Sequence, residues 1–163
     1  MEFRSDSPGK PDIKRLAAAC TQNASEPALD QYIKPAHWEV LADYLQPSEI
    51  AQSQVLITRG ANDRTVYFVE DGSLTVHYEN KAGQVRLGIL GPGSAVGEGS
   101  FFSHLPRNAT VQTASASRVW ALTPIRFSEL SNRQPAVALA VSMALGGLVS
   151  SRVFDRRKRS CVT

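Results

Sequence analysis

The sequence has 163 residues, a formal net charge of +3 and 42% hydrophobic residues. That length favours one domain, and a domain of this size buries roughly 70% of its unfolded surface, so it needs no disulfide or metal to hold a core. The two cysteines, Cys20 and Cys161, lie near opposite ends, which argues against a disulfide framework. The polar, charged N-terminus does not resemble a secretory signal, so we expect a cytoplasmic protein.

The N-terminal part of the chain is predicted to be an arm followed by a helix. Residues 1–27 mix Ser, Pro, Lys and Asn, which indicates a flexible arm with one short helical stretch around residues 13–20. Residues 28–46 are predicted to be helical, because Trp38, Leu41 and Leu45 recur at helical spacing behind Pro35.

The middle of the chain, residues 48–123, is predicted to be β structure. Its short runs rich in Val, Ile, Leu and Thr are separated by turn signals, such as Asp71-Gly72 and the Gly-Pro-Gly at residues 91–93. Regular turn spacing favours a closed antiparallel sandwich or barrel over a parallel sheet. We therefore predict an α+β, mainly β fold: an antiparallel, jelly-roll-like β-roll flanked by an N-terminal helix and two C-terminal helices.

The two C-terminal helices are expected over residues 124–157, with a basic tail at 158–163. Thr123 and Pro124 form a helix start, and Pro135 begins a longer apolar helix. Residues 134–151 carry no charge and approach spanning length, but Ser, Gly and Ala dilute the run, so no membrane span is expected. A helix that is apolar on most sides is usually buried by its own domain and a partner, which favours a homodimer through this helix.

The segment VGEGSFFSHLPRNATV, residues 96–111, carries the chemistry of the chain. Gly97 and Gly99 let the backbone approach a ligand, and Arg107 offers a planar fork of donors suited to phosphate oxygens. Glu98 would repel a phosphate but accepts hydrogen bonds from hydroxyl groups. The pattern indicates a sugar phosphate with a free hydroxyl on one side and an anionic phosphodiester on the other. The alternative is a Glu98–Arg107 ion pair that only staples the loop.

This segment resembles the phosphate-binding cassette of the cyclic-nucleotide-binding domain family, of the catabolite-activator and protein-kinase-A regulatory-subunit type. The matching positions are Val96, Gly97, Glu98, Ser100, Phe101, Pro106, Arg107, Ala109, Thr110 and Val111. The resemblance implies that residues 28–157 form such a domain, and that its ligand is cAMP or cGMP with no further cofactor. Relatives that regulate transcription carry a helix-turn-helix after the long helix; only a few residues follow it here, so direct DNA binding is not expected.

The resemblance also implies a role for each site residue. Glu98 would accept the ribose 2′-hydroxyl, Arg107 would pair with the cyclic phosphate, and the last helix near Arg152, Val153 and Phe154 would lie over the base. Val76, Leu87 and Leu90 would form apolar walls. The expected ligand-binding residues are therefore Val76, Leu87, Leu90, Gly97, Glu98, Gly99, Ser100, Arg107, Asn108 and Ala109. Asn108 matches neither the cAMP nor the cGMP habit of the family, so base preference stays open.

Other chemistry has no candidate in the sequence. His37, His77 and His104 are scattered, which argues against a metal site, and nucleotide-fold and hydrolase motifs do not occur. We therefore expect a regulatory sensor, not an enzyme. It would signal by moving the C-terminal helices, with Gly146-Gly147 as a weak point. Two alternatives stay open: a degenerate, ligand-free interaction and dimerisation module, or a regulatory piece of a larger channel or enzyme.

Overall fold

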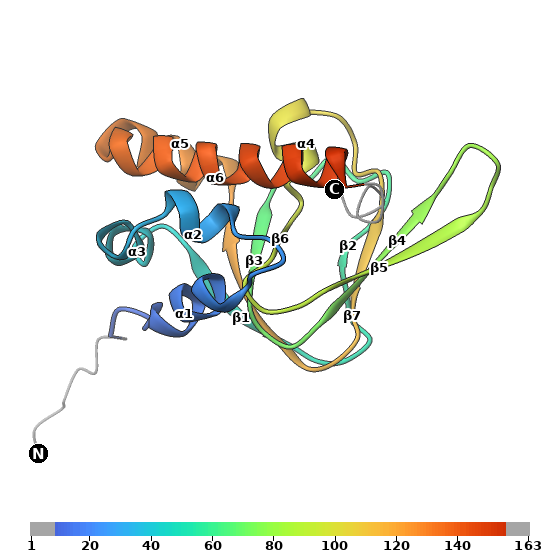
Figure 1. Cartoon of the computed structure of the whole chain (residues 1–163), viewed down its shortest axis with the longest axis horizontal. Coiled ribbons are helices and arrows are strands. Elements are labelled where there is room, and N and C mark those ends of the chain that lie inside the picture. The colour runs from blue at the N-terminus through green and yellow to red at the C-terminus, as the bar shows by residue number, and fades with distance from the viewer. Residues whose placement is uncertain (1–8, 156–163) are drawn as a thin grey trace, which may run out of the picture.

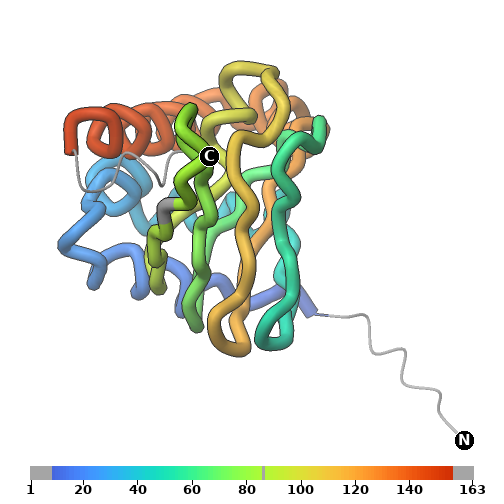
Figure 2. Tube along the Cα trace, turned by 90° about the vertical axis from the view of Figure 1, so that its right-hand side faces the viewer, coloured from blue at the N-terminus to red at the C-terminus, as the bar shows by residue number. Residues whose placement is uncertain are grey.

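The β-rich middle of the chain folds into two antiparallel four-stranded sheets, with strand orders β1-β8-β3-β6 and β2-β7-β4-β5. The computed structural model describes residues 9–155, and the two sheets form opposite walls of a roll (Figures 1 and 2). The strands are β1 (Gln46–Ile50), β2 (Val55–Ile57), β3 (Val66–Asp71), β4 (Leu74–Glu79), β5 (Val85–Leu90), β6 (Ala95–Val96), β7 (Thr110–Thr113) and β8 (Ser117–Leu122). The predicted antiparallel β-roll is confirmed.

Alternation along the strands sets their register. In β4, Leu74 and Val76 are fully buried inside the roll, while Thr75 and His77 between them are only half-buried. A shift by one residue would turn the apolar side chains outward, so burial of one face specifies the pairing of β4 with β5 and β7.

Helices cover one side of the roll and interrupt it once. They are α1 (Lys14–Gln22), α2 (Ala28–Tyr32), α3 (Pro35–Leu41), α4 (Glu98–Ser103), α5 (Pro124–Arg133) and α6 (Pro135–Phe154). The predicted start of α5 is confirmed, because the hydroxyl of Thr123 accepts the backbone N–H of Arg126 at 3.2 Å. α6 contacts α2 and α5 and crosses the molecule so that its C-terminal end reaches the roll beside α4 (Figure 1).

The segment before the roll is docked, which corrects the flexible arm predicted for residues 1–27. Within residues 9–27, α1 buries Leu16 and Cys20, which are one helical turn apart. Gly93, at φ +82°, lies so close to α1 that a Cβ there would be 2.3 Å from the carbonyl oxygen of Ala19. The short helical stretch predicted around residues 13–20 is therefore present as α1, and only its mobility was predicted wrongly. The part of the predicted arm at residues 1–8 lies outside the described residues.

The helix predicted over residues 28–46 is two short helices followed by a strand. The backbone is extended at Ile33 and Lys34, because a residue before proline disfavours the helical conformation and Pro35 starts a new helix. Residues from Gln46 on pair with β8 as strand β1. At the other end, α6 ends at Phe154 and the backbone of Asp155 is extended, so the helix predicted to reach residue 157 ends earlier. The basic tail predicted at residues 158–163 lies outside the described residues.

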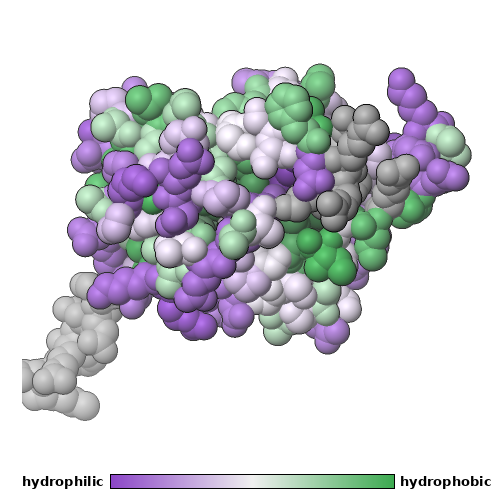
Figure 3. All heavy atoms as spheres, viewed as in Figure 1, coloured by the Kyte–Doolittle hydropathy of each residue, from purple (hydrophilic) through white to green (hydrophobic). Residues whose placement is uncertain are grey.

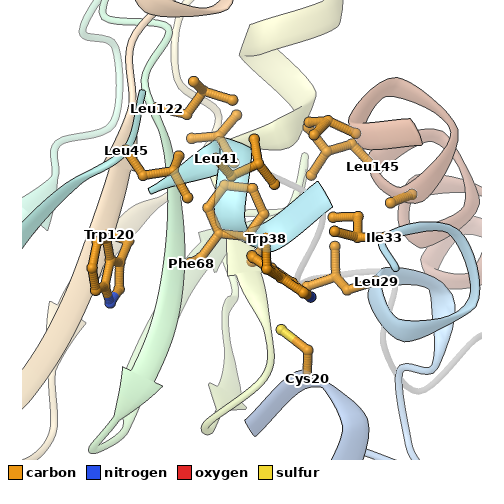
Figure 4. Close-up of a cluster of buried hydrophobic side chains, with 14 of the residues drawn as sticks. Cys20, Leu29, Ile33, Trp38, Leu41, Leu45, Phe68, Trp120, Leu122 and Leu145 are labelled. Atoms are coloured by element: carbon orange, nitrogen blue, oxygen red, sulfur yellow. The ribbon is translucent and has the colours of Figure 1, made fainter. Parts of the chain in front are cut away.

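The main hydrophobic core lies between the sheet β1-β8-β3-β6 and the helices (Figure 4). Trp38 of α3 and Phe68 of β3 pack edge to face, with ring centroids 6.5 Å apart. A second cluster fills the roll and includes Val76, Leu90, Val96 and Ala109. Because Val96 and Ala109 lie near the two ends of the cassette, the segment between them is anchored in the roll at both ends.

Among residues 9–155, α6 is long and apolar enough to cross a membrane by length and composition, with a mean hydropathy of 1.7 over its best window. Core helices satisfy the same criterion, and Val141, Leu145 and Leu148 of α6 are fully buried against the rest of the domain. Its outer side exposes Leu139 and Met143. The absence of a membrane span therefore stays a prediction.

Candidate functional site

The cassette turns at Gly97, which sits in the left-handed region with φ +92° and precedes α4. A Cβ at this position would lie 2.5 Å from the carbonyl oxygen of Thr65 and 2.7 Å from Nη1 of Arg107, so only glycine fits. The N–H groups of Gly99 and Ser100 fall in the first turn of α4, where an N–H has no acceptor within its own helix. The turn therefore brings backbone donors and the Arg107 side chain to the same place.

Arg107 is buried, with 2% of its surface exposed, and is held by three acceptors. Its Nη1 donates to the carbonyl oxygen of Gly97 at 2.9 Å, and its Nη2 donates to that of Thr65 at 2.6 Å and to Oδ2 of Asp63 at 2.8 Å. Its Nε is buried and has no hydrogen-bond partner among the described residues. An unmatched buried donor is costly, and this edge of the guanidinium is able to donate to a further acceptor. Nε of Arg64 is also buried without a partner among the described residues.

Glu98 is completely buried and is held by a residue of the last helix. Its Oε1 accepts Nη1 of Arg152 at 2.7 Å. Nε and Nη2 of Arg152 donate to the two carboxylate oxygens of Glu26, at 2.7 and 3.1 Å, and Nη2 also donates to the carbonyl oxygen of Ala95 at 2.9 Å. Burial alone would lower the pKa of Arg152, but attraction to Glu98 and Glu26 outweighs it and raises that pKa, so the guanidinium remains charged.

These contacts overturn the ion pair considered as the plainer alternative from the sequence. Glu98 pairs with Arg152 and Arg107 pairs with Asp63, each with an N–O distance of 2.7 or 2.8 Å. The two cassette residues therefore do not staple the loop to itself. Each is tied instead to a distant part of the chain.

Leu87 differs from the other two residues predicted to form apolar walls, because it is exposed where they are buried. It pairs with His77 across β4 and β5, on the outer face of the roll, and 57% of its surface is exposed. Val76 and Leu90 are buried on the inner face and share a cluster with Ala109. Strand alternation explains the difference, because side chains an odd number of residues apart on one strand point to opposite faces.

The remaining predicted residues are divided between two cavities. Gly99, Ser100 and Asn108 line one of about 200 Å³. Leu90 lines another of about 160 Å³ together with Glu26. Each is smaller than a typical small-molecule site of roughly 300–1,000 Å³. A larger cavity of about 650 Å³ lies elsewhere, beside α1 and residues Glu70 and Asp71 of β3.

The end of α6, which was expected to cover the base, contacts the cassette through Arg152. Arg152 turns inward to Glu98 and has no exposed surface, whereas 48% of Val153 and 83% of Phe154 are exposed. Sequence reasoning also missed Glu26 and Asp63. Asp63 stands in an Ala-Asn-Asp turn that signalled only a loop, and Glu26 lay in the predicted arm, so neither position carried a signal of its own.

A family model agrees with this geometry. The model for the cyclic nucleotide-binding domain matches residues 47–134, which is more than half of the chain. The chain belongs to the cyclic nucleotide-binding domain family. The match contains the whole cassette and ends before α6, so Glu26 and Arg152 both lie outside it.

Solved structures of cyclic nucleotide-binding domains share the fold. One from Methylobacillus flagellatus is 16% identical, with a TM-score of 0.77, and the alignment covers 90% of this chain and 83% of that one. The regulatory domain of Toxoplasma gondii PKA, solved with cAMP, is 26% identical with a TM-score of 0.59, over 71% of this chain and 43% of that one.

A curated relative comes from Pseudomonas aeruginosa and is named the Pycsar effector protein PaPycTIR. The two are 31% identical over 106 residues, which is 64% of this chain and 33% of the relative. The chain therefore spans about a third of the length of PaPycTIR.

Proposed function

We propose that this cyclic nucleotide-binding domain binds a cyclic nucleoside monophosphate, cAMP or cGMP, and acts as a regulatory sensor and not as an enzyme. The observation that carries the proposal is the Nε of Arg107, a buried cationic donor without a partner among residues 9–155. It lies beside the turn at Gly97, where the first N–H groups of α4 have no acceptor within their own helix. An anionic phosphodiester oxygen is the acceptor that suits a charged, desolvated donor.

The electrostatics of the site suit a ligand that is anionic at one end and carries a hydroxyl at the other. Arg107 supplies positive charge, and Asp63 forms an ion pair with it through Nη2. Glu98 would repel an anion, but its pairing with Arg152 offsets that charge. The carboxylate is then suited to accept a sugar hydroxyl, as the family resemblance implies for the ribose.

Ligand entry in this proposal requires movement at the end of α6. The cavities beside Ser100 and beside Leu90 are each smaller than a typical ligand site, and Arg152 reaches Glu98 from α6. The face of α4 that follows Glu98 contacts the C-terminal helices through Phe101, whose ring lies 5.0 Å from that of Phe127 in α5. Movement of α4 on binding would therefore shift α5 and α6, with Gly146-Gly147 as a place to bend.

A regulatory role gains support from the relatives. PaPycTIR is named as an effector, and the Toxoplasma gondii domain is the regulatory domain of a kinase. The rival function, a ligand-free interaction module, is favoured by the exposed apolar residues Leu139 and Met143 on α6. The two functions differ in whether a nucleotide binds at all.

Calorimetric titration of cAMP and of cGMP, each into the purified protein and into Arg107→Ala, tests the proposal. We expect saturable 1:1 binding that weakens about ten- to a hundredfold in the variant, because loss of a charge-assisted contact costs roughly 1.5–3 kcal/mol. Arg107→Lys separates charge from geometry: it keeps the cation, loses the fork of donors and should fall between the two.

The matched control is Arg59→Ala, which removes an exposed arginine that pairs with Glu79 on the roll surface. This change should leave affinity unaltered. Absence of heat with both nucleotides, from protein shown to carry no bound ligand, would contradict the proposal and favour the interaction module.

A further inference from the structure

Arg152 lies between two carboxylates that occupy different edges of its guanidinium. Glu26 takes the edge formed by Nε and Nη2 in a bidentate pair, and Glu98 takes Nη1. All three side chains are buried, with 4% of Glu26 and none of Arg152 or Glu98 exposed. Because the donors are separate, the two carboxylates do not compete. Glu26 fixes the position from which Arg152 holds Glu98.

The position of Glu26 is fixed by hydrogen bonds that involve Ser94 and Asn23. Its Oε1 accepts the hydroxyl of Ser94 at 2.9 Å, and Asn23 donates to the same hydroxyl at 3.3 Å. Gly93, next to Ser94, lies directly against the C-terminal end of α1. The segment from α1 to α2 is therefore docked on the turn that leads into the cassette, and its carboxylate reaches across that turn.

Because Glu26, Arg152 and Glu98 are all buried, the interactions of the two carboxylates with Arg152 depend strongly on each other. A buried ion pair costs a large desolvation energy, and removal of one partner leaves an uncompensated charge in a medium of low dielectric. A change at Glu26 therefore reaches Glu98 through one shared guanidinium, although Glu26 lies 126 residues from Arg152 along the chain.

We infer that Glu26 is a positioning residue for nucleotide recognition: through Arg152 it sets the geometry in which Glu98 accepts the ribose hydroxyl. The inference rests on the proposed function. It makes the N-terminal helices, which lie outside the family match at residues 47–134, part of the control of the site. It also gives ligand occupancy a direct route to them, because the group that reads the sugar and the group that anchors α2 bind the same side chain.

The test compares each cyclic nucleotide with its 2′-deoxy analogue, which lacks the hydroxyl assigned to Glu98. Affinities for cAMP, cGMP and both analogues are measured by calorimetry in wild type, Glu26→Gln and Glu26→Asp. We expect Glu26→Gln to weaken binding of the better nucleotide about tenfold, while binding of its 2′-deoxy analogue stays nearly unchanged. Glu26→Asp keeps the charge and should recover part of the loss.

Glu70→Gln is the matched control, since Glu70 is also a buried carboxylate with ion-pair partners, but in the sheet beside Trp120. It should not alter the discrimination between nucleotide and analogue. If Glu26→Gln loses the same affinity for the nucleotide and for its analogue, or loses none, the inference is overturned. The proposed function still stands in that case, provided that the wild-type protein binds the nucleotide. A wild-type protein that binds neither nucleotide overturns both. If Glu26→Gln does not fold, Glu26→Asp alone carries the comparison.

Discussion

At the scale of single residues, Asp63 connects the cassette arginine to the loop before β3. Partial burial alone would raise the pKa of Asp63, but hydrogen bonds from Arg107 and Thr65 and the charge of Arg107 outweigh it and hold that pKa below its usual range. A carboxylate whose pKa is lower in the folded state stabilises the protein above its unfolded pKa, and this contribution is lost as the pH falls through the folded value.

We therefore expect Asp63→Asn to unfold at a lower temperature than wild type at neutral pH. This difference should begin to shrink below about pH 4, where the unfolded carboxyl protonates first, and should be lost as the pH falls through the lower pKa of the folded state. Thermal unfolding of both proteins between pH 7 and pH 3 measures it. Asp43→Asn serves as control, because Asp43 forms an exposed pair with Lys10 at 3.2 Å. A difference in melting temperature that stays constant over the whole pH range would contradict this assignment.

The sequence allowed prediction of which cassette residues carry the chemistry, but not of their partners. Glu98 and Arg107 stand out because a carboxylate and an arginine flank one Gly-rich turn. Their partners come from residues 54 and 44 positions away, Arg152 and Asp63. Contacts over such separations depend on how α6 and the loop before β3 pack, which a local pattern does not contain. The pairing of Glu98 with Arg107, considered only as the alternative to a ligand site, is contradicted by these contacts.

At the scale of elements, the contact between α1 and the turn before β6 holds the N-terminal helices to the roll. A Cβ at Gly93 would lie 2.3 Å from the carbonyl oxygen of Ala19 and 2.7 Å from Cβ of Asn23. Gly93→Ala should therefore destabilise the protein twice, through the left-handed backbone and through displacement of α1. The backbone part alone is about 1–2 kcal/mol.

Gly60→Ala isolates the backbone part, because Gly60 has φ +84° and no atom within 4 Å of a Cβ placed there. Denaturant unfolding should show a loss for Gly93→Ala that exceeds the loss for Gly60→Ala by about 1–3 kcal/mol, the usual range for overpacking. Equal losses would mean that α1 moves aside without cost and is not firmly docked.

Elements with a strong periodic pattern were predicted well, and those held by distant contacts were not. The strands alternate because one face of each is buried in the roll, so their existence follows from local sequence. The single helix predicted over residues 28–46 was wrong, because Pro35 begins a new helix and keeps Lys34 in an extended conformation. The short helix expected around residues 13–20 is present as α1, but its docking was not predicted, because Leu16 and Cys20 are buried against parts of the fold that are distant in sequence.

At the scale of the whole molecule, the helix layer and the roll are joined through the site itself. The main core lies under the helices and the second cluster lies inside the roll. Glu98 belongs to α4 of the roll, Arg152 to α6 and Glu26 to the segment before α2, so three parts of the chain meet at one guanidinium. In the proposed sensor, a shift of the cassette would therefore reach both ends of the helix layer through these contacts.

Two apolar surfaces remain on the outside of this arrangement. Hydrophobic side chains gather on the roll toward the β4–β5 hairpin (Figure 3), where β5 exposes Val85, Leu87 and Ile89. The other surface is the outer stripe of α6, where Leu139 is 63% and Met143 47% exposed. Gly146 continues that stripe at helical spacing, and the absence of a side chain there allows a second helix to approach closely.

We expect the α6 stripe to pair two copies of the chain. Light scattering at micromolar concentration should give the mass of two chains, and the double variant Leu139→Glu, Met143→Glu should give the mass of one, because four charges would have to be buried in the interface. Both positions are exposed in the single chain, so the melting temperature corrected for dissociation should change little.

Val85→Glu provides the control, since Val85 is 68% exposed but stands on the hairpin of the roll, away from α6. This variant should keep the mass of two chains. A wild-type protein of single-chain mass would rule out the α6 dimer, and loss of the dimer in Val85→Glu alone would move the interface to β5. If the wild-type protein has the mass of one chain, nucleotide binding would have to signal within that chain, through Arg152 and the N-terminal helices.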